Sequence, residues 1–65
     1  MDEKATLETF FKMMILEEHG AQKKYEMAQA LTSSPELTKL LARFAAEETI
    51  HAQLLESELM KLEKK

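Results

Sequence analysis

Hydrophobic residues recur at steps of three and four along most of this 65-residue chain, which is the spacing of an amphipathic helix. One break, the segment Thr32-Ser33-Ser34-Pro35, separates two such stretches. The pattern predicts a helix over about residues 4–31, a turn over 32–34 and a second helix over about residues 35–62. Because so short a connection makes consecutive helices antiparallel, we predict an all-α hairpin that forms one domain over residues 1–65.

The ends of the predicted helices carry residues that are typical of helix caps. Asp2 precedes the first helix, and either Ser33 or Ser34 can cap the second, whose first turn accommodates Pro35. Ser33 and Glu36 also have the spacing of a capping box. These features place the turn firmly between the two stretches.

Each predicted helix has a hydrophobic stripe that is interrupted by ionisable residues. Glu18 interrupts the first stripe, and Glu48 and His51 interrupt the second. A carboxylate on a buried face costs several kcal/mol unless its charge is compensated, so these three residues are the leading candidates for chemistry. The stripes themselves consist of Leu7, Phe11, Met14, Ala21, Tyr25 and Ala28, flanked by Phe10, Ile15 and Leu31, and of Leu37, Leu41, Phe44, Leu55, Leu59 and Leu62, flanked by Leu40, Ala45 and Ala52.

The three interrupting residues are expected at one level of the hairpin. Glu18 lies about 15 residues before the middle of the turn and Glu48 about 15 residues after it, so both are roughly 20–25 Å from the turn. His51 follows Glu48 by three residues and therefore shares its helix face. One hairpin is thus expected to bring together two carboxylates and one imidazole.

The size of the chain favours self-association and metal binding. A domain this small buries only a modest share of its surface, and the chain has no cysteine for a disulfide or a thiolate metal site. Two hairpins related by a two-fold axis would offer two such clusters, which is the ligand set of di-iron carboxylate bundles: a Glu from each of two helices and a Glu-x-x-His from each of the other two. The four carboxylates would balance two Fe²⁺ ions; Mn²⁺ fits equally well and Zn²⁺ stays open.

Neighbouring residues have two interpretations each. The Tyr25 hydroxyl either hydrogen-bonds a ligand carboxylate or reaches water at the edge of the core, and Gln22 either hydrogen-bonds Glu18 or is exposed. Glu17 and Glu47 either line a path for cations or belong to a solvated face. A polar layer that sets the register of a metal-free helical oligomer is the alternative for the whole cluster.

Further residues and the overall charge narrow the function classes. His19 is expected at the surface, and Gly20 suggests a close helix approach or room beside the metal, because a glycine inside a helix costs about 1 kcal/mol relative to alanine. The net charge of −3 and the absence of a basic cluster argue against nucleic acid as a partner. With no membrane-length apolar run and no basic start, a cytoplasmic protein is expected.

The chain resembles the rubrerythrin-like branch of the ferritin-like superfamily, and most closely its two-helix encapsulated ferritins. The resemblance rests on Glu18 with Tyr25 seven residues later, on Ser-Pro-Glu-Leu-Thr-Lys-Leu-Leu-Ala at 34–42, and on Glu47-Glu48-Thr-Ile-His51-Ala52. It covers most of residues 14–60 and implies a ferritin-like four-helix bundle made from two chains.

By this resemblance Glu18, Glu48 and His51 are the ligands of two iron ions per dimer, with Glu48 bridging them, and the activity is that of a ferroxidase in iron storage or detoxification. A rubrerythrin-like peroxidase of oxidative-stress defence and a metal-free oligomerisation module are the alternatives. The family also implies a ring of dimers inside an encapsulin nanocompartment. The sequence departs from the family after Met60, where it shows neither the third short helix nor the targeting tail. Whether the protein is packed inside such a compartment is therefore left open.

Overall fold

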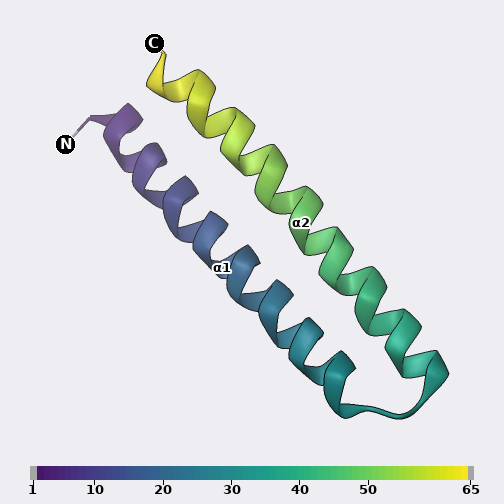
Figure 1. Cartoon of the computed structure of the whole chain (residues 1–65). Coiled ribbons are helices and arrows are strands. Elements are labelled where there is room, and N and C mark those ends of the chain that lie inside the picture. Colours follow the sequence, from purple (N-terminus) through teal and green to yellow (C-terminus); the bar gives the residue numbers. More distant parts are fainter. Residues whose placement is uncertain (1, 65) are drawn as a thin grey trace.

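The computed structural model describes residues 2–64 and is a hairpin of two helices (Figure 1). Helix α1 spans Glu3–Leu31 and α2 spans Pro35–Glu63. The prediction of an all-helical hairpin is confirmed, and each helix extends one residue beyond the predicted bounds at its outer end. Residues 1 and 65 of the predicted domain lie outside the described residues.

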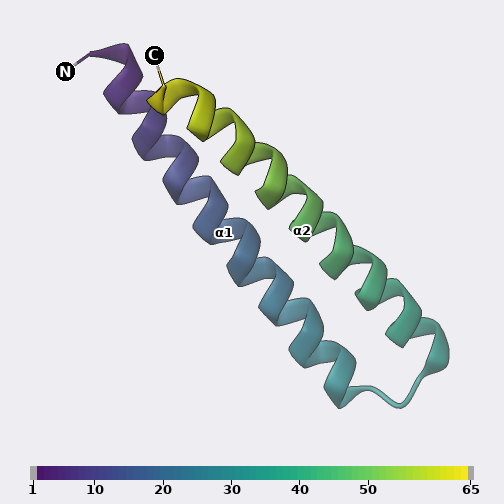
Figure 2. The same cartoon turned by 45° about the horizontal axis from the view of Figure 1, so that its top comes forward.

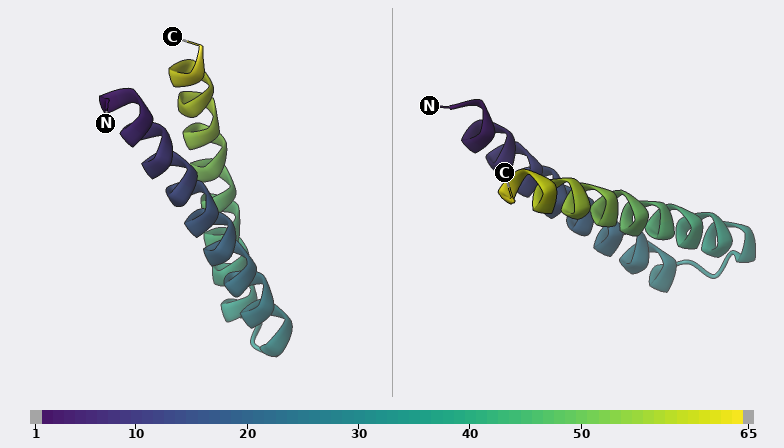
Figure 3. Two further views of the ribbon diagram at one scale, coloured as in Figure 1. Left: turned by 90° about the vertical axis from the view of Figure 1, so that its left-hand side faces the viewer. Right: turned by 90° about the horizontal axis from the view of Figure 1, so that it is seen from above.

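The two helices form a slender rod with both ends of the described chain at the same end (Figures 1 and 2). Its dimensions are 49 × 17 × 11 Å. The turned views show that the helices cross at a shallow angle and do not run strictly parallel (Figure 3). This is the arrangement that ridges-into-grooves packing favours in helical bundles. No helix within residues 2–64 is both long and apolar enough to cross a membrane.

Local hydrogen bonds fix where the helices begin and end. The Asp2 carboxylate accepts a hydrogen bond from the Ala5 N–H at 2.7 Å, and the Ser34 hydroxyl accepts one from the Leu37 N–H at 3.3 Å. Ser34, directly before Pro35, is therefore the cap of α2, and the predicted capping box from Ser33 to Glu36 is wrong. Pro35 is the first residue of the helix, so the residue before it takes the capping position.

The contact between the helices is centred on small side chains. Ala45 and Ala52 on α2, seven residues apart, are the only buried residues of the described chain, with 8% and 1% of their surface exposed. The sequence pattern placed them beside the stripe, whereas the structure places them at its centre. Larger residues such as Phe11, Met14 and Leu55 flank this contact and are half-buried. Each helix has a single neighbour, so much of each hydrophobic stripe has no covering layer.

One side of the hairpin is therefore an exposed hydrophobic surface, which we call the open face. Several of its side chains are substantially exposed, including Leu40 at 42%, Phe10 at 55% and Leu54 at 62%. Monomeric proteins rarely expose hydrophobic groups in such continuity, so this face has the properties of an interaction surface. It comprises Leu7, Phe10, Met14, Leu37, Leu40, Leu54 and Leu55.

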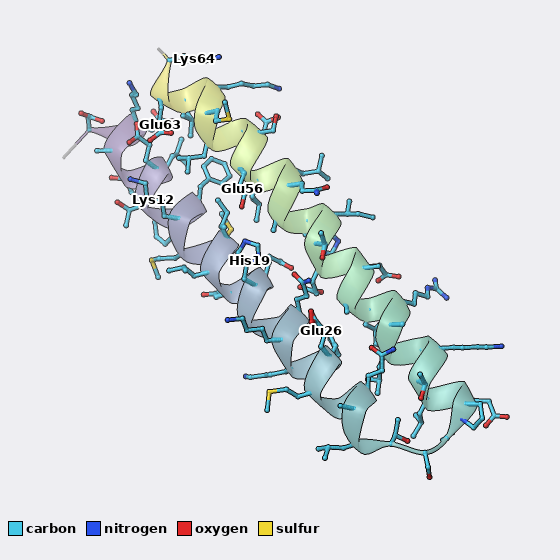
Figure 4. All side chains as sticks on the ribbon, viewed as in Figure 1. Lys12, His19, Glu26, Glu56, Glu63 and Lys64 are labelled. Atoms are coloured by element: carbon cyan, nitrogen blue, oxygen red, sulfur yellow. The ribbon has the colours of Figure 1, made fainter. Side chains whose placement is uncertain are left out.

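The opposite side of the hairpin is polar. Figure 4 shows charged side chains along the line where the two helices meet, on the side turned to the viewer. His19 of α1 reaches Glu56 of α2, with its Nε2 3.4 Å from the Glu56 Oε1. About half of each side chain is exposed, so this pair contributes little to stability. The charged and histidine side chains labelled in Figure 4 are Lys12, His19, Glu26, Glu56, Glu63 and Lys64.

Candidate metal centre

Glu18 of α1 and Glu48 and His51 of α2 form one cluster halfway along the hairpin. Each residue offers one ligand atom such that the three atoms lie within 4.8 Å of one another. The antiparallel packing creates this proximity, because it places the middle of α1 beside the middle of α2. This is the only group of three or more potential ligands that residues 2–64 bring together, and it could hold a metal ion.

The spacing inside the cluster resembles the edges of a coordination shell. His51 Nδ1 is 3.4 Å from Glu18 Oε2 and 3.9 Å from Glu48 Oε1. An efficient N–H···O hydrogen bond is shorter, at about 2.7–3.2 Å. Two ligand atoms that each lie about 2.1 Å from a shared cation are separated by about 3.0–3.4 Å, so a small contraction would place all three around one ion.

The exposure of the three side chains differs in a way that matters for metal access. The side chains of Glu18 and Glu48 are 24% and 19% exposed, whereas that of His51 is 53% exposed. The carboxylates are thus held between the helices while the imidazole lies at the edge of the open face. Met14, Leu54 and Leu55 join Glu18 and His51 in lining a groove of about 330 Å³.

The two carboxylates oppose each other's ionisation. The pKa of Glu48 is raised above its ordinary value of 4.5, mainly by a side-chain hydrogen bond with Glu18, and further by partial burial and by the negative charge of Glu18. Glu47 raises the pKa of Glu48 as well, whereas His51 lowers it. A cation between the two carboxylates would remove this conflict, because it favours the ionised form of both.

Tyr25 and Gln22 are the two residues that were predicted to hydrogen-bond the cluster carboxylates. The Tyr25 ring packs against that of Phe44, with centroids 5.5 Å apart and planes at 49°. Within residues 2–64 the structure contains no hydrogen bond from the Tyr25 hydroxyl or the Gln22 side chain to a cluster carboxylate. Their predicted role as hydrogen-bond partners of the ligands is therefore not met inside one chain. The contact between Tyr25 and Phe44 was not predicted, although both residues lie on the predicted stripes.

The flanking residues Glu17 and Glu47 are not part of the group of potential metal ligands. Glu47 is held by Arg43, whose Nε donates to its carboxylate at 3.0 Å, and Glu17 is exposed. The expectation that His19 lies at the surface agrees with its exposure. Gly20 is also exposed, and a Cβ atom built there would meet no atom within 4 Å, so neither a close approach inside the hairpin nor room beside the cluster accounts for it.

Fold and site together define a two-helix hairpin with an interhelical pair of carboxylates and one imidazole that could hold a metal ion. No family model, curated protein or solved structure matches the chain. The resemblance to ferritin-like proteins thus stays a prediction that rests on the quoted residues.

Proposed function

We propose that two copies of the chain pair through their open faces into a ferritin-like four-helix bundle that oxidises Fe²⁺ to Fe³⁺. The observation that carries this proposal is the position of the cluster. Two half-buried carboxylates and an imidazole lie together beside an exposed hydrophobic surface, where a second copy would add the same three groups. Covering the open face would bury its leucines and exclude water from the site.

The charge of the cluster supports a pair of divalent ions. Two copies would contribute four carboxylates with a total charge of −4 when ionised, which two Fe²⁺ ions balance. Carboxylate oxygens with one imidazole for each metal suit Fe²⁺ and Mn²⁺, and Zn²⁺ would bind to the same donors. The raised pKa of Glu48 supports the same view, since the hydrogen bond with Glu18 and the negative charge of Glu18 oppose the ionisation of Glu48, and a cation would favour it.

The three cluster residues would have different roles in binding and oxidising iron. Glu18 and Glu48 would bind the Fe²⁺ substrate, with Glu48 between the two ions as the family resemblance implies. His51 would complete the ligand set of each ion from the edge of the open face. Each of two Fe²⁺ ions would give up one electron, and one O₂ molecule would take both electrons and two protons to form hydrogen peroxide. The Fe³⁺ product would then leave for storage.

The two histidines of the chain offer a matched test. Purified protein receives Fe²⁺ in air, and the ferric absorbance is followed together with the molecular mass in solution. His51→Ala should slow iron oxidation at least about tenfold, since it removes one ligand from each ion. His19→Ala should leave the rate unchanged, because it removes only the exposed contact with Glu56. Equal rates for the two variants would refute the assigned site.

Further assays on the purified wild-type protein distinguish the ferroxidase from the competing functions. A peroxidase would turn over hydrogen peroxide with an added reductant faster than it oxidises Fe²⁺ in air. A metal-free oligomerisation module would form the dimer with no response of its melting temperature to Fe²⁺ or to a chelator. Either result would displace the ferroxidase proposal.

A further inference from the structure

Helix α1 carries a second hydrophobic stripe on the side that faces away from α2. Met27 follows Glu18 by nine residues, which is about two and a half helical turns, so it points in the opposite direction from the metal cluster. Its neighbours on this side are strongly exposed, with Leu16 at 71% and Leu31 at 87%. We call this surface the outer face; it comprises Met13, Leu16, Gly20, Met27 and Leu31.

The outer face is distinct from the open face and would stay exposed in the proposed four-helix bundle. The open face lies beside Glu18 and His51, whereas the outer face lies on the far side of α1. Met13, Gly20 and Met27 are spaced by seven residues, the spacing of helix-to-helix contacts. Pairing through the open face therefore leaves a continuous helical seam without a partner.

Gly20, at the centre of this seam, has no explanation within the hairpin. Its φ is not positive, and a Cβ atom built there would meet nothing within 4 Å. Alanine would fit the fold and would favour the helix, so the glycine is unfavourable for the isolated chain. A glycine on an exposed helix face does allow the backbone of another helix to approach closely.

We propose that the outer face binds the outer face of a second copy, with the two α1 helices antiparallel and crossing at Gly20. A two-fold axis through Gly20 brings residue i opposite residue 40 − i of the other copy. Met13 then meets the other copy's Met27, and the two Gly20 residues meet each other. This contact is independent of the metal and of the reaction at the cluster.

The charges beside the seam favour this antiparallel register. Glu17 lies on the same side of the seam as Lys24 of the other copy and at nearly the same level, and this attractive pair occurs twice because of the symmetry. Leu16 lies beside Lys23 of the other copy, whose aliphatic stem can cover it. A parallel pairing would instead place Glu17 and Lys24 of the other copy on opposite sides of the seam and about two turns apart, so this pair would not form. None of these three charged residues makes an ion pair within residues 2–64, so all are free to do so across the contact.

The two faces together predict assemblies with an even number of chains. Each copy would use the open face for one neighbour and the outer face for another, and both contacts are two-fold symmetric. The outer contact involves one helix from each copy and is therefore the weaker of the two. Dimers would form first and associate further as the protein concentration rises.

The test measures molecular mass by light scattering over a range of concentrations. Met27→Glu should raise the concentration at which dimers associate by at least about tenfold, which corresponds to the loss of one central contact. Met60→Glu is the matched control, because Met60 is similarly exposed, at 56% against 66%, but lies on α2 outside both faces. Gly20→Ala should weaken the same association while it raises the melting temperature of the dimer.

The register has its own test in a charge exchange. Glu17→Lys should weaken association, and combining it with Lys24→Glu should restore it, since both pairs become attractive again. Wild-type protein that stays a dimer at every concentration would overturn the outer contact and leave the metal site intact. Met27→Glu protein that becomes monomeric would also overturn it, because Met27 would then belong to the open-face dimer.

Discussion

Replacing Glu48 by glutamine should change the stability of the protein in opposite directions with and without metal. The substitution keeps the size of the side chain and removes its charge. In the metal-free protein the raised pKa of Glu48 shows that the fold disfavours its ionised form. The amide of glutamine can donate a hydrogen bond to Glu18 without adding negative charge. We therefore expect Glu48→Gln to raise the melting temperature of chelator-treated protein at pH 7.

The sign follows from proton linkage. A carboxyl group whose pKa is raised in the folded state binds its proton more readily there than in the unfolded chain. The free energy of unfolding of the metal-free protein should therefore increase as the pH falls from the raised pKa of Glu48 toward 4.5, its ordinary value. Above the raised pKa this contribution is lost. In Glu48→Gln this part of the pH dependence should disappear.

When metal is bound, the wild-type protein should have a higher melting temperature than Glu48→Gln. An ion that binds only the folded site stabilises the protein by about 2.7 kcal/mol at a free concentration 100 times its dissociation constant. For a domain of this size, each kcal/mol shifts the melting temperature by about 4–8 °C, so the wild-type protein should gain roughly 10–20 °C. The variant should gain little, because its site has lost one of two carboxylates and two charges in each dimer.

The assay is thermal unfolding followed by circular dichroism, with Mn²⁺ as a probe that does not oxidise in air. Four samples suffice: wild type and Glu48→Gln, each with chelator and with Mn²⁺. Glu26→Gln is the matched control, since Glu26 is an exposed carboxylate of the polar side, outside the cluster. A Mn²⁺-dependent gain in Glu48→Gln that equals the wild-type gain would refute the reasoning.

Two further predictions concern the packing of the hairpin. Leu40→Glu places a charge on the open face, where Leu40 is 42% exposed, and should convert the dimer to a monomer and abolish the stabilisation by Mn²⁺; a dimer of unchanged mass would contradict the proposed pairing. Ala52→Leu enlarges a side chain that is 1% exposed at the helix contact and should destabilise the protein by about 1–3 kcal/mol in urea unfolding, whereas the same change at the exposed Ala46 should have little effect.

Much of the fold could be predicted because the chain has one clear break between two periodic stretches. The turn of residues 32–34 determines which parts of the helices meet, so the proximity of Glu18 and Glu48 could be expected from counting alone. His51 follows from helical geometry, since it lies one turn beyond Glu48. Local periodicity and a short turn are properties of the sequence that no other part of the molecule alters.

The details that could not be predicted depend on side-chain size and competition between neighbours. Both Ser33 and Ser34 have the chemistry of a cap, and the position of the first helical residue selects Ser34. The stripe pattern gives equal weight to leucine and alanine, yet close approach of two helices favours the small Ala45 and Ala52 at the centre. The proposed second copy would leave no local trace in the chain apart from the hydrophobic residues that stay exposed.

The location of both chain ends at one end of the rod limits how the proposed bundle could be made as a single polypeptide. A two-fold axis through the cluster places the ends of the second copy at the opposite end of a molecule 49 Å long. Joining the copies would take a fully extended linker of about 15 residues, or a helix of about 30, laid along the outside of the bundle. Gene fusion with a short linker would therefore tether two hairpins without allowing them to pair, and would favour exchange of partners between fused molecules.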